Sequence, residues 1–365
     1  MPTKAIAEQL ASKGVNLTEV RRAIPPECLK PTPWRAWLTL ARVSLLAAAC
    51  LAILVVLPLD PGWALLWEIP ALVVMWFVYG SVLVGYFLIG HDAEHHAFSR
   101  RGWVNRLVGT LCLSPLFNAP RVWKLTHDHH HRHTQLKGQD VDWAANLVTR
   151  EEFGALTWRR DFAVKLGYAL PFGIFFWIGR NTVRRAVAVR GMLGEERYAQ
   201  ERWGLLLSSA LMLACSLSIY ALIYWQWGLW PLLKLHAIPL AFSGIIGSIL
   251  VTIGHASEQS LLYEEKSWSP TRAQVASSYN YRLPGWYEWL VLNINIHLPH
   301  HVCTTIPWYR LKQANAALHE AFPDYCQEMP LTWSEMAWIR TTPFLRHDVE
   351  LGLYEIESDS GRAAA

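Results

Sequence analysis

The chain has 365 residues, of which 52% are hydrophobic and only 17% are charged. A soluble globular domain carries about 25% charged residues, so this composition argues against an ordinary soluble protein. The net charge of +4 is too small to indicate a nucleic-acid-binding protein. The 20 tryptophans favour a membrane protein instead, because tryptophan collects at membrane interfaces.

The first 33 residues mix charges with prolines and contain no apolar stretch of the signal-peptide type. We therefore expect the first membrane span to direct its own insertion. The six cysteines form no CxxC pair, which indicates small apolar fillers rather than a disulfide or metal framework.

Four apolar stretches are long enough to cross a bilayer, which takes about 20 residues of helix. The predicted transmembrane helices cover residues 37–58, 67–90, 204–230 and 235–254. Two shorter apolar runs, 107–120 and 166–179, contain prolines and fit interfacial or buried helices better. Arginines flank the second run on both sides, which also argues against its crossing the membrane.

The distribution of basic residues predicts the orientation of the chain. Lysines and arginines crowd residues 100–202 and are almost absent from the turns after the first and third spans. By the positive-inside rule, the two histidine-rich parts, 91–202 and 255–345, then lie in the cytoplasm. The predicted fold is all-α: a single membrane domain over residues 1–365, with four transmembrane helices and a cytoplasmic helical cap.

Eleven of the 15 histidines fall into three short clusters. The clusters read His91-Asp-Ala-Glu-His95-His96, His127-Asp-His129-His130-His131-Arg-His133 and His297-Leu-Pro-His300-His301. Residues three and four apart share one face of a helix, so the first two clusters each aim several imidazoles at one point. Imidazole is a good ligand for iron, zinc, copper and nickel, so the clusters predict metal binding.

The predicted topology brings these clusters together with one further histidine. His91 directly follows the second span and His255 directly follows the fourth, and both spans end on the predicted cytoplasmic side. The candidate metal ligands are His91, His95, His127, His130, His131, His255, His297, His300 and His301. Zinc usually takes four ligands, so nine imidazoles indicate two metal ions rather than one.

The remaining histidines are expected to have surface or structural roles: His96, His129, His133, His236, His319 and His347. His96 directly follows His95 and could replace it as a ligand.

Three segments resemble the membrane fatty acid desaturases, in particular the acyl-lipid desaturases of the ω-6 type. HDAEHHAFS at 91–99, WKLTHDHHHRHT at 123–134 and NINIHLPHHVCTTIPWY at 293–309 are similar to the three histidine boxes of that family. Two details depart from the pattern: Glu94 replaces a small residue, and Asp128 and His129 replace a basic pair. These changes leave the ligands intact and the substrate subclass open.

The resemblance implies four membrane spans, a cytoplasmic catalytic cap and two iron ions held by the box histidines. His255 matches an additional histidine that family members carry before the third box. The family also implies oxygen as co-substrate, an acyl lipid or fatty acyl chain as substrate, and an electron donor such as ferredoxin. Asn293 or Asn295 could lie near the metals.

Two other groups of residues are expected around such a centre. Carboxylates could hydrogen-bond the imidazole N–H groups and fix their tautomers. The candidates are Asp92, Glu94, Asp140 and Asp142, for which a solvated or helix-end position is the alternative. Tryptophans could line a tunnel for the acyl chain or anchor the protein at the membrane interface. The candidates are Trp103, Trp123 and Trp143.

Other functions share part of this pattern. A hydroxylase or ketolase acting on a carotenoid, alkane or sphingolipid uses related histidine motifs and is the alternative enzyme. Outside enzymes, the alternative is a membrane metal-binding protein such as a receptor or transporter. A transporter would place ionisable residues inside its spans, and the interiors of these spans lack charge. A membrane zinc hydrolase is a third alternative, weakened by the number of ligands.

Overall fold

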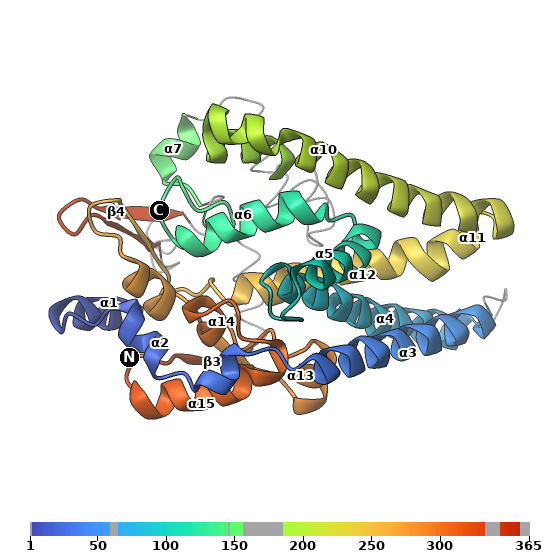
Figure 1. The fold of residues 1–365 in the computed structure, drawn as a ribbon, viewed down its shortest axis with the longest axis horizontal. Helices are drawn as coiled ribbons and strands as arrows, with labels where there is room; N and C mark the ends of the chain where they lie inside the picture. Colours follow the sequence, from blue (N-terminus) through green and yellow to red (C-terminus); the bar gives the residue numbers. More distant parts are fainter. Residues whose placement is uncertain are drawn as a thin grey trace.

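The computed structural model describes residues 2–58, 65–142, 144, 147–155, 185–332 and 344–357. Figure 1 shows long helices running side by side toward one end of the molecule, with shorter helices and strands gathered at the other end. We refer to this second end, where α1, α14 and β4 lie, as the cap.

The long helices supply four candidate membrane spans. They are α3 (Pro33–Val56), α4 (Leu65–Glu94), α10 (Arg185–Trp227) and a fourth built from α11 (Leu229–Leu232), the π-helical turn η5 (Leu233–Ala237) and α12 (Ile238–Ile253). Each is long and apolar enough to cross a membrane, and each predicted span falls on one of them. Helix α4 continues beyond its predicted end to Glu94, so His91 lies in the last turn of the second candidate span and His95 directly follows it.

The four spans differ in how much of each is buried. Helix α4 lies at the centre, packed against α3, α5 (Gly102–Leu113) and α12, and 61% of its apolar window is buried. Helix α10 packs on α6 (Pro120–Arg132) and η2 (Ser114–Leu116), and only 11% of its window is buried. Helix α10 is therefore a peripheral span whose leucines face the surroundings.

Short helices connect the spans and build the cap. Besides α5, η2 and α6, they are α1 (Thr3–Ser12), α2 (Leu17–Arg22), η1 (Pro26–Leu29), α7 (Arg150–Gly154), η6 (Arg272–Ala276), α13 (Gly285–Leu290), α14 (Leu298–Val302), η7 (Trp308–Arg310) and α15 (Leu311–Ala321). The apolar run 107–120 forms the end of α5, all of η2 and the start of α6, and it does not cross the bundle. The run 166–179 lies outside the described residues.

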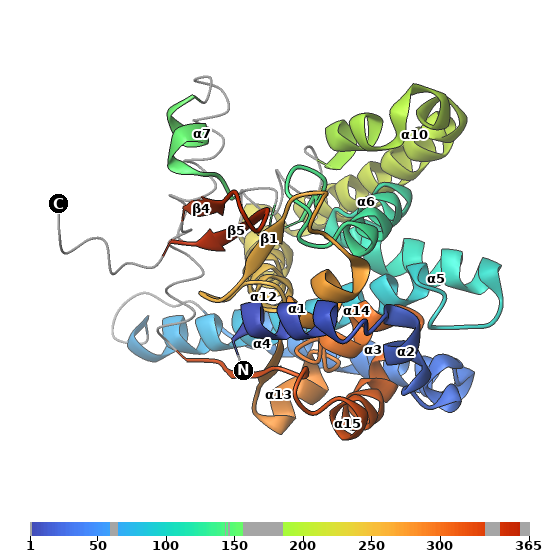
Figure 2. The ribbon, with the colours of Figure 1, turned by 90° about the vertical axis from the view of Figure 1, so that its left-hand side faces the viewer.

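Five short strands, which were not among the predicted elements, brace the cap. They are β1 (Leu261–Tyr263), β2 (Asn280–Arg282), β3 (Glu328–Pro330), β4 (Leu345–Asp348) and β5 (Leu353–Ile356). Strands β1, β5 and β4 form an antiparallel sheet in that order, seen beside α7 in Figure 2, and β2 pairs with β3 in parallel. The chain remains mostly helical, and the paired strands join short segments of the cap.

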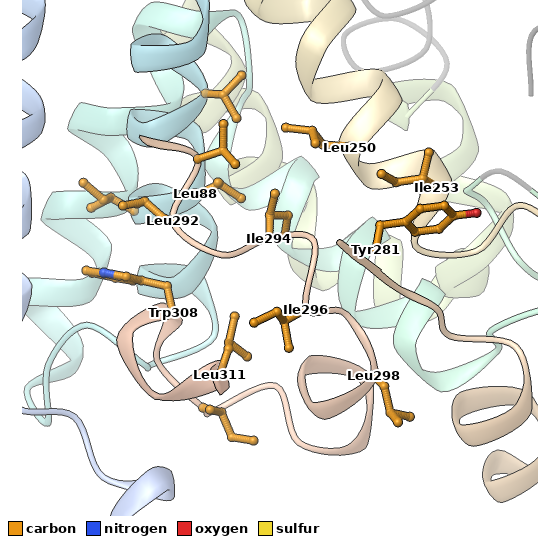
Figure 3. Packing of buried hydrophobic residues seen from close by; sticks show 14 of the residues in the cluster. Leu88, Leu250, Ile253, Tyr281, Leu292, Ile294, Ile296, Leu298, Trp308 and Leu311 are labelled. Carbon is orange, nitrogen blue, oxygen red and sulfur yellow. The ribbon is translucent and has the colours of Figure 1, made fainter. Parts of the chain in front are cut away.

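A continuous apolar core joins the bundle to the cap. Figure 3 shows Leu88 of α4 and Leu250 of α12 on either side of Ile294, with Ile253 of α12 beside Tyr281. Ile294 and Ile296 lead into the third histidine cluster. Ile294 and Ile296 are buried, and Ile253 is fully buried. Packing of this segment against the ends of α4 and α12 therefore positions the third cluster beside the first.

Candidate metal centre

The nine predicted ligand histidines lie together, all buried, where α4 and α12 meet the cap. Their ring nitrogens form two groups. The first set comprises His91, His95, His127, His131 and His300. The second set comprises His130, His255, His297 and His301. In the first set, one ring nitrogen each of His91, His95, His127 and His300 lie within 4.8 Å of one another. In the second set, the same holds for His130, His255 and His301.

Helical spacing builds most of the first set. His91 and His95 lie one turn apart at the end of α4, and His127 and His131 lie one turn apart on α6. The Nε2 atom of His127 is 3.1 Å from Nε2 of His91 and 3.0 Å from Nε2 of His131. His300 of α14 completes the set.

The second set draws on segments that are far apart in the sequence. Nε2 of His255, just beyond α12, lies 3.1 Å from Nε2 of His130 and 2.9 Å from Nε2 of His297. His297 packs directly on the backbone of Gly254, where a Cβ atom would lie 2.4 Å from the imidazole Cδ2. Only glycine leaves room for the ring at this position.

The nitrogen positions fit metal coordination. Metal–nitrogen bonds are about 2.1 Å long, so two ligands at a right angle are about 3 Å apart, as these Nε2 pairs are. Nε2 of His95, His300 and His301 is buried with no hydrogen-bond partner among the described residues. Buried polar atoms are normally paired, so these atoms indicate that metal ions are the missing partners.

The protonation of the cluster also favours metal binding. Burial, reinforced by neighbouring imidazoles, lowers the pKa well below the usual value of 6.5 for His95, His127, His131, His297, His300 and His301. Imidazoles with so low a pKa are neutral at physiological pH and keep a lone pair for a metal ion.

Two aspartates hold imidazoles in the orientation that metal binding requires. Nδ1–H of His91 donates to Asp92 Oδ1 at 2.8 Å, and Asp92 Oδ2 accepts the backbone N–H of Trp308 at 2.9 Å. Nδ1–H of His130 donates to Asp140 Oδ1 at 2.7 Å. Asp140 is itself held by the backbone N–H of Gln135. A proton fixed on Nδ1 leaves Nε2 free to bind a metal.

The other predicted polar neighbours are placed differently. The Glu94 carboxyl group lines a cavity beside the first set, and Asp142 donates its backbone N–H to Asp140. Asn293 donates to the carbonyl of Trp308, and Asn295 donates to the carbonyl of Tyr281 and to Glu288. No hydrogen bond from either asparagine to an imidazole occurs in the described part of the chain.

The three predicted tryptophans occupy different environments. Trp123 is buried, with its ring centroid 4.4 Å from that of His127 and 5.2 Å from that of His91, so it forms one wall of the first set. Trp103 is 58% exposed at the start of α5, as an interfacial anchor would be. Trp143 lies outside the described residues.

The six other histidines stay out of the two sets. His96 is exposed with a φ of 61°, and its ring lies beside Asn105, so His95 and not His96 joins the first set. The His129 ring stacks on that of His133. His236 of the fourth candidate span packs on Tyr220 of α10. His319 and His347 contact surface glutamates.

Some positioning residues could not be found from the motifs. Oδ1 of Asn280 accepts the backbone N–H groups of both His297 and Leu298 and so fixes the start of α14. Asn280 lies on β2, well before the third cluster, and no spacing rule points to it. Oγ1 of Thr134 lies 3.4 Å from Nδ1 of His301. Thr134 belongs to the second motif, but the motif alone does not predict this contact.

Apolar helices long enough to span a membrane, ending on nine buried histidines in two adjoining sets, define a helical membrane protein with a candidate metal centre. The family model described as "Fatty acid desaturase" matches residues 61–333, which include all three histidine clusters. The chain belongs to the fatty acid desaturase family, and it is therefore an oxidoreductase.

Curated relatives agree over most of their length. The chain is 27% identical over 326 residues to an sn-1 oleoyl-lipid 12-desaturase of Picosynechococcus sp., covering 88% of each chain. It is 28% identical to the enzyme of the same name from Synechocystis sp., covering 89% of this chain and 87% of the relative. It is 25% identical to a chloroplastic omega-6 fatty acid desaturase of Spinacia oleracea, covering 90% of this chain and 69% of the relative. These names favour desaturation over the hydroxylase, ketolase and non-enzymatic alternatives.

Proposed function

We propose that this protein uses oxygen to desaturate the acyl chain of a membrane lipid at a di-iron centre held by the two histidine sets. The observation that carries the proposal is the convergence of nine buried imidazoles into two adjoining sets. The sets meet through His131 and His301, whose ring centroids are 4.3 Å apart. Family membership supplies the chemistry.

The reaction must balance hydrogens and electrons. Two C–H bonds on adjacent methylene carbons break and a C=C bond forms. Oxygen takes up these two hydrogens, two further electrons and two protons, and leaves as two water molecules. The iron ions, when bound, supply the oxygen activation that removal of hydrogen from an unactivated carbon requires.

The residues of this chain hold and shield such a centre. The nine histidines would bind the metals, and Asp92 and Asp140 would hold the Nδ1 protons of His91 and His130. Trp123 would shield one side of the first set, because its ring packs on that of His127. Asn280 keeps His297 and its neighbours in register through their backbone.

Metal analysis tests the centre directly. Imidazole also suits zinc, copper and nickel, so the identity of the metal rests on family membership. The purified protein is expected to hold about two iron ions, and His130→Ala is expected to lose iron and activity because it removes a second-set ligand. His319→Ala, at a histidine paired with Glu328 outside both sets, should keep both. Stoichiometric zinc in place of iron would contradict the proposal.

The names of the relatives suggest the position of the new double bond. We propose the 12-position of an oleoyl chain, by analogy with the relatives from Picosynechococcus sp. and Synechocystis sp.. Expression in a host without polyunsaturated lipids, followed by gas chromatography and mass spectrometry, should show an 18-carbon dienoic acid. Hydroxylated or keto products, or an oxygenated carotenoid, would favour the alternative enzymes instead.

We also propose that residues 1–365 form one domain whose four spans cross the membrane, with the cap in the cytoplasm and a ferredoxin as electron donor. The shared apolar core supports the single domain, because it includes Ile6 of α1, Leu88 of α4 and Leu353 of β5. Trypsin should cut the cap in inverted vesicles and not in intact cells, and reduced ferredoxin should sustain turnover by the purified protein. Cleavage in intact cells would reverse the orientation.

A further inference from the structure

A cavity of about 270 Å³ lies beside the first histidine set, between the end of α4, α5, the start of α6 and α10. Five ionisable side chains line it: Glu94, His96, Arg106, Arg121 and Lys124. The cavity is slightly smaller than the 300–1,000 Å³ typical of ligand pockets, so it suits a small polar group rather than a long acyl chain.

The cavity is reached from the lipid. One wall is a single face of α10, formed by Gly204, Leu207, Ser208 and Leu211, which are three or four residues apart. Leu207 and Leu211 are exposed, and α10 is the least buried of the four candidate spans. An occupant of this cavity would thus come from the membrane, with its polar part in the cavity and its tails among the spans.

Glu94 is the feature of the cavity that most needs a ligand. Its side chain lies over Gly109, where a Cβ atom would come within 2.4 Å of Glu94 Oε1. Only 8% of the residue is exposed, and no donor hydrogen-bonds its carboxylate in the described part of the chain. A carboxylate buried so deeply is costly unless a charged or hydrogen-bonding partner reaches it.

The cations around Glu94 are unequally engaged. Arg121 forms a bidentate pair with Glu201, with Nε at 3.0 Å from Oε2, and Lys124 lies 3.0 Å from Asp128. Arg106 forms no ion pair among the described residues, although it lies within electrostatic range of Glu94. In the part of the chain that the structure describes, the cavity therefore presents a carboxylate without a hydrogen-bond donor and a guanidinium without a hydrogen-bonded acidic partner.

We propose that this cavity binds the head group of a zwitterionic aminophospholipid, with its phosphate on Arg106 and its ammonium on Glu94. Arginine pairs with phosphate through parallel hydrogen bonds, and an ammonium group carries the N–H donors that a carboxylate lacks here. An anionic glycerophosphate head group would leave Glu94 unpaired, and a neutral sugar would bring no charge to either residue. This inference rests on the proposed function, because it names the lipid class whose acyl chain reaches the metals.

Reconstitution of the full-length protein tests the proposal. Dioleoyl phosphatidylethanolamine, phosphatidylglycerol and monogalactosyl diacylglycerol would be offered in equal amounts, with bound lipid counted by native mass spectrometry and products by head group. The unaltered protein should retain and convert phosphatidylethanolamine preferentially. Loss of one charge-assisted hydrogen bond should lower that preference about tenfold in Glu94→Gln and in Arg106→Gln. The exposed residues Glu195 and Arg101 supply the controls Glu195→Gln and Arg101→Gln, which should retain it.

The other outcomes distinguish a failure of the head-group proposal from a failure of the proposed function. Equal use of the three lipids, a preference for either of the others, or a preference that Glu94→Gln leaves unchanged would overturn the head-group assignment alone. Glu94-dependent lipid binding without any desaturation would overturn the proposed function alone. Iron content checks that Glu94→Gln has not disturbed His95, and if iron is lost, Arg106→Gln at its exposed guanidinium decides the question.

Discussion

The two histidine sets reach similar geometries by different means. In the first set, two helices present their histidines one turn apart, and Nδ1 of His127 and of His131 has no hydrogen-bond partner in the described residues. In the second set, Nδ1 of His130 is held by Asp140 at 2.7 Å, and that of His255 lies 3.3 Å from the carbonyl of Ser277. Helix geometry positions His91, His95, His127 and His131 of the first set, whereas tertiary contacts bring the segments of the second set together.

This difference has a physical consequence. A regular helix holds side chains one turn apart with no help from the rest of the fold. The second set depends on close contacts between α12, η6 and α14, so small changes in the cap should affect it more.

Acid should destabilise the metal-free protein, because both sets contain histidines with a lowered pKa. Below about pH 6.5 the unfolded chain binds protons that the folded cap rejects. The stability is therefore complete above that pH and falls as the pH drops toward the lower folded pKa values. The loss approaches about 1.4 kcal/mol per pH unit for each such histidine.

Thermal unfolding of chelator-treated protein between pH 7.5 and 5.5 measures this loss. The iron-loaded protein should unfold at a higher temperature throughout, because metal binds only the folded form. A metal-free protein whose unfolding temperature is independent of pH would show that the imidazoles are not held neutral by burial.

Gly254→Ala should damage the second set without removing any of its ligands. The added Cβ atom would meet the His297 ring, and a displacement of about 1 Å at a catalytic centre can lower activity about a hundredfold. Iron should fall from about two toward one per chain. Gly191→Ala, where a Cβ atom meets nothing within 4 Å, is the matched control. Retention of both iron ions by Gly254→Ala would show that the cap can shift to admit the methyl group.

Asp140→Asn should weaken metal binding in the second set about ten- to a hundredfold, the usual effect of removing a partner of a metal-bound histidine. The Asp140 carboxylate also accepts the backbone N–H groups of Gln135 and Asp142, so the loop after α6 should loosen as well. Titration of the chelated protein with ferrous iron should show one weakened site and one unchanged site.

Asp92→Asn should have a smaller effect, about tenfold on the first set, because α4 still directs His91 inward. The same iron titration, run beside Asp140→Asn, compares the two sets directly. If Asp92→Asn were the more damaging of the two, the idea that helix geometry makes the first set self-sufficient would be wrong.

The same contrast explains what could be predicted from the sequence. The four spans followed from uninterrupted apolar length, and the pairing of His91 with His95 followed from helical spacing. The same spacing predicted that His127, His130 and His131 aim at one point, and this was wrong for His130, which joins the second set. The place of His255 beside the others followed only from the order of the spans.

The rest depended on contacts that no local pattern encodes. Strands of three or four residues, such as β1 and β2, are too short to show a periodicity. The space that Gly254 leaves for His297, and that Gly109 leaves for Glu94, arises between distant segments. For the same reason Glu94 could be singled out as unusual, yet its position in the cavity could not be foreseen.

The candidate metal ligands come from α4, α6 and α14 and from the residue that follows α12. This arrangement also matters for how the protein is made in a cell. Metal ions would tie together segments that leave the ribosome far apart in time, so iron supply would govern maturation as well as catalysis. In iron-starved cells we expect the newly inserted chain to be cleared by membrane proteases, so its abundance should follow the iron in the growth medium.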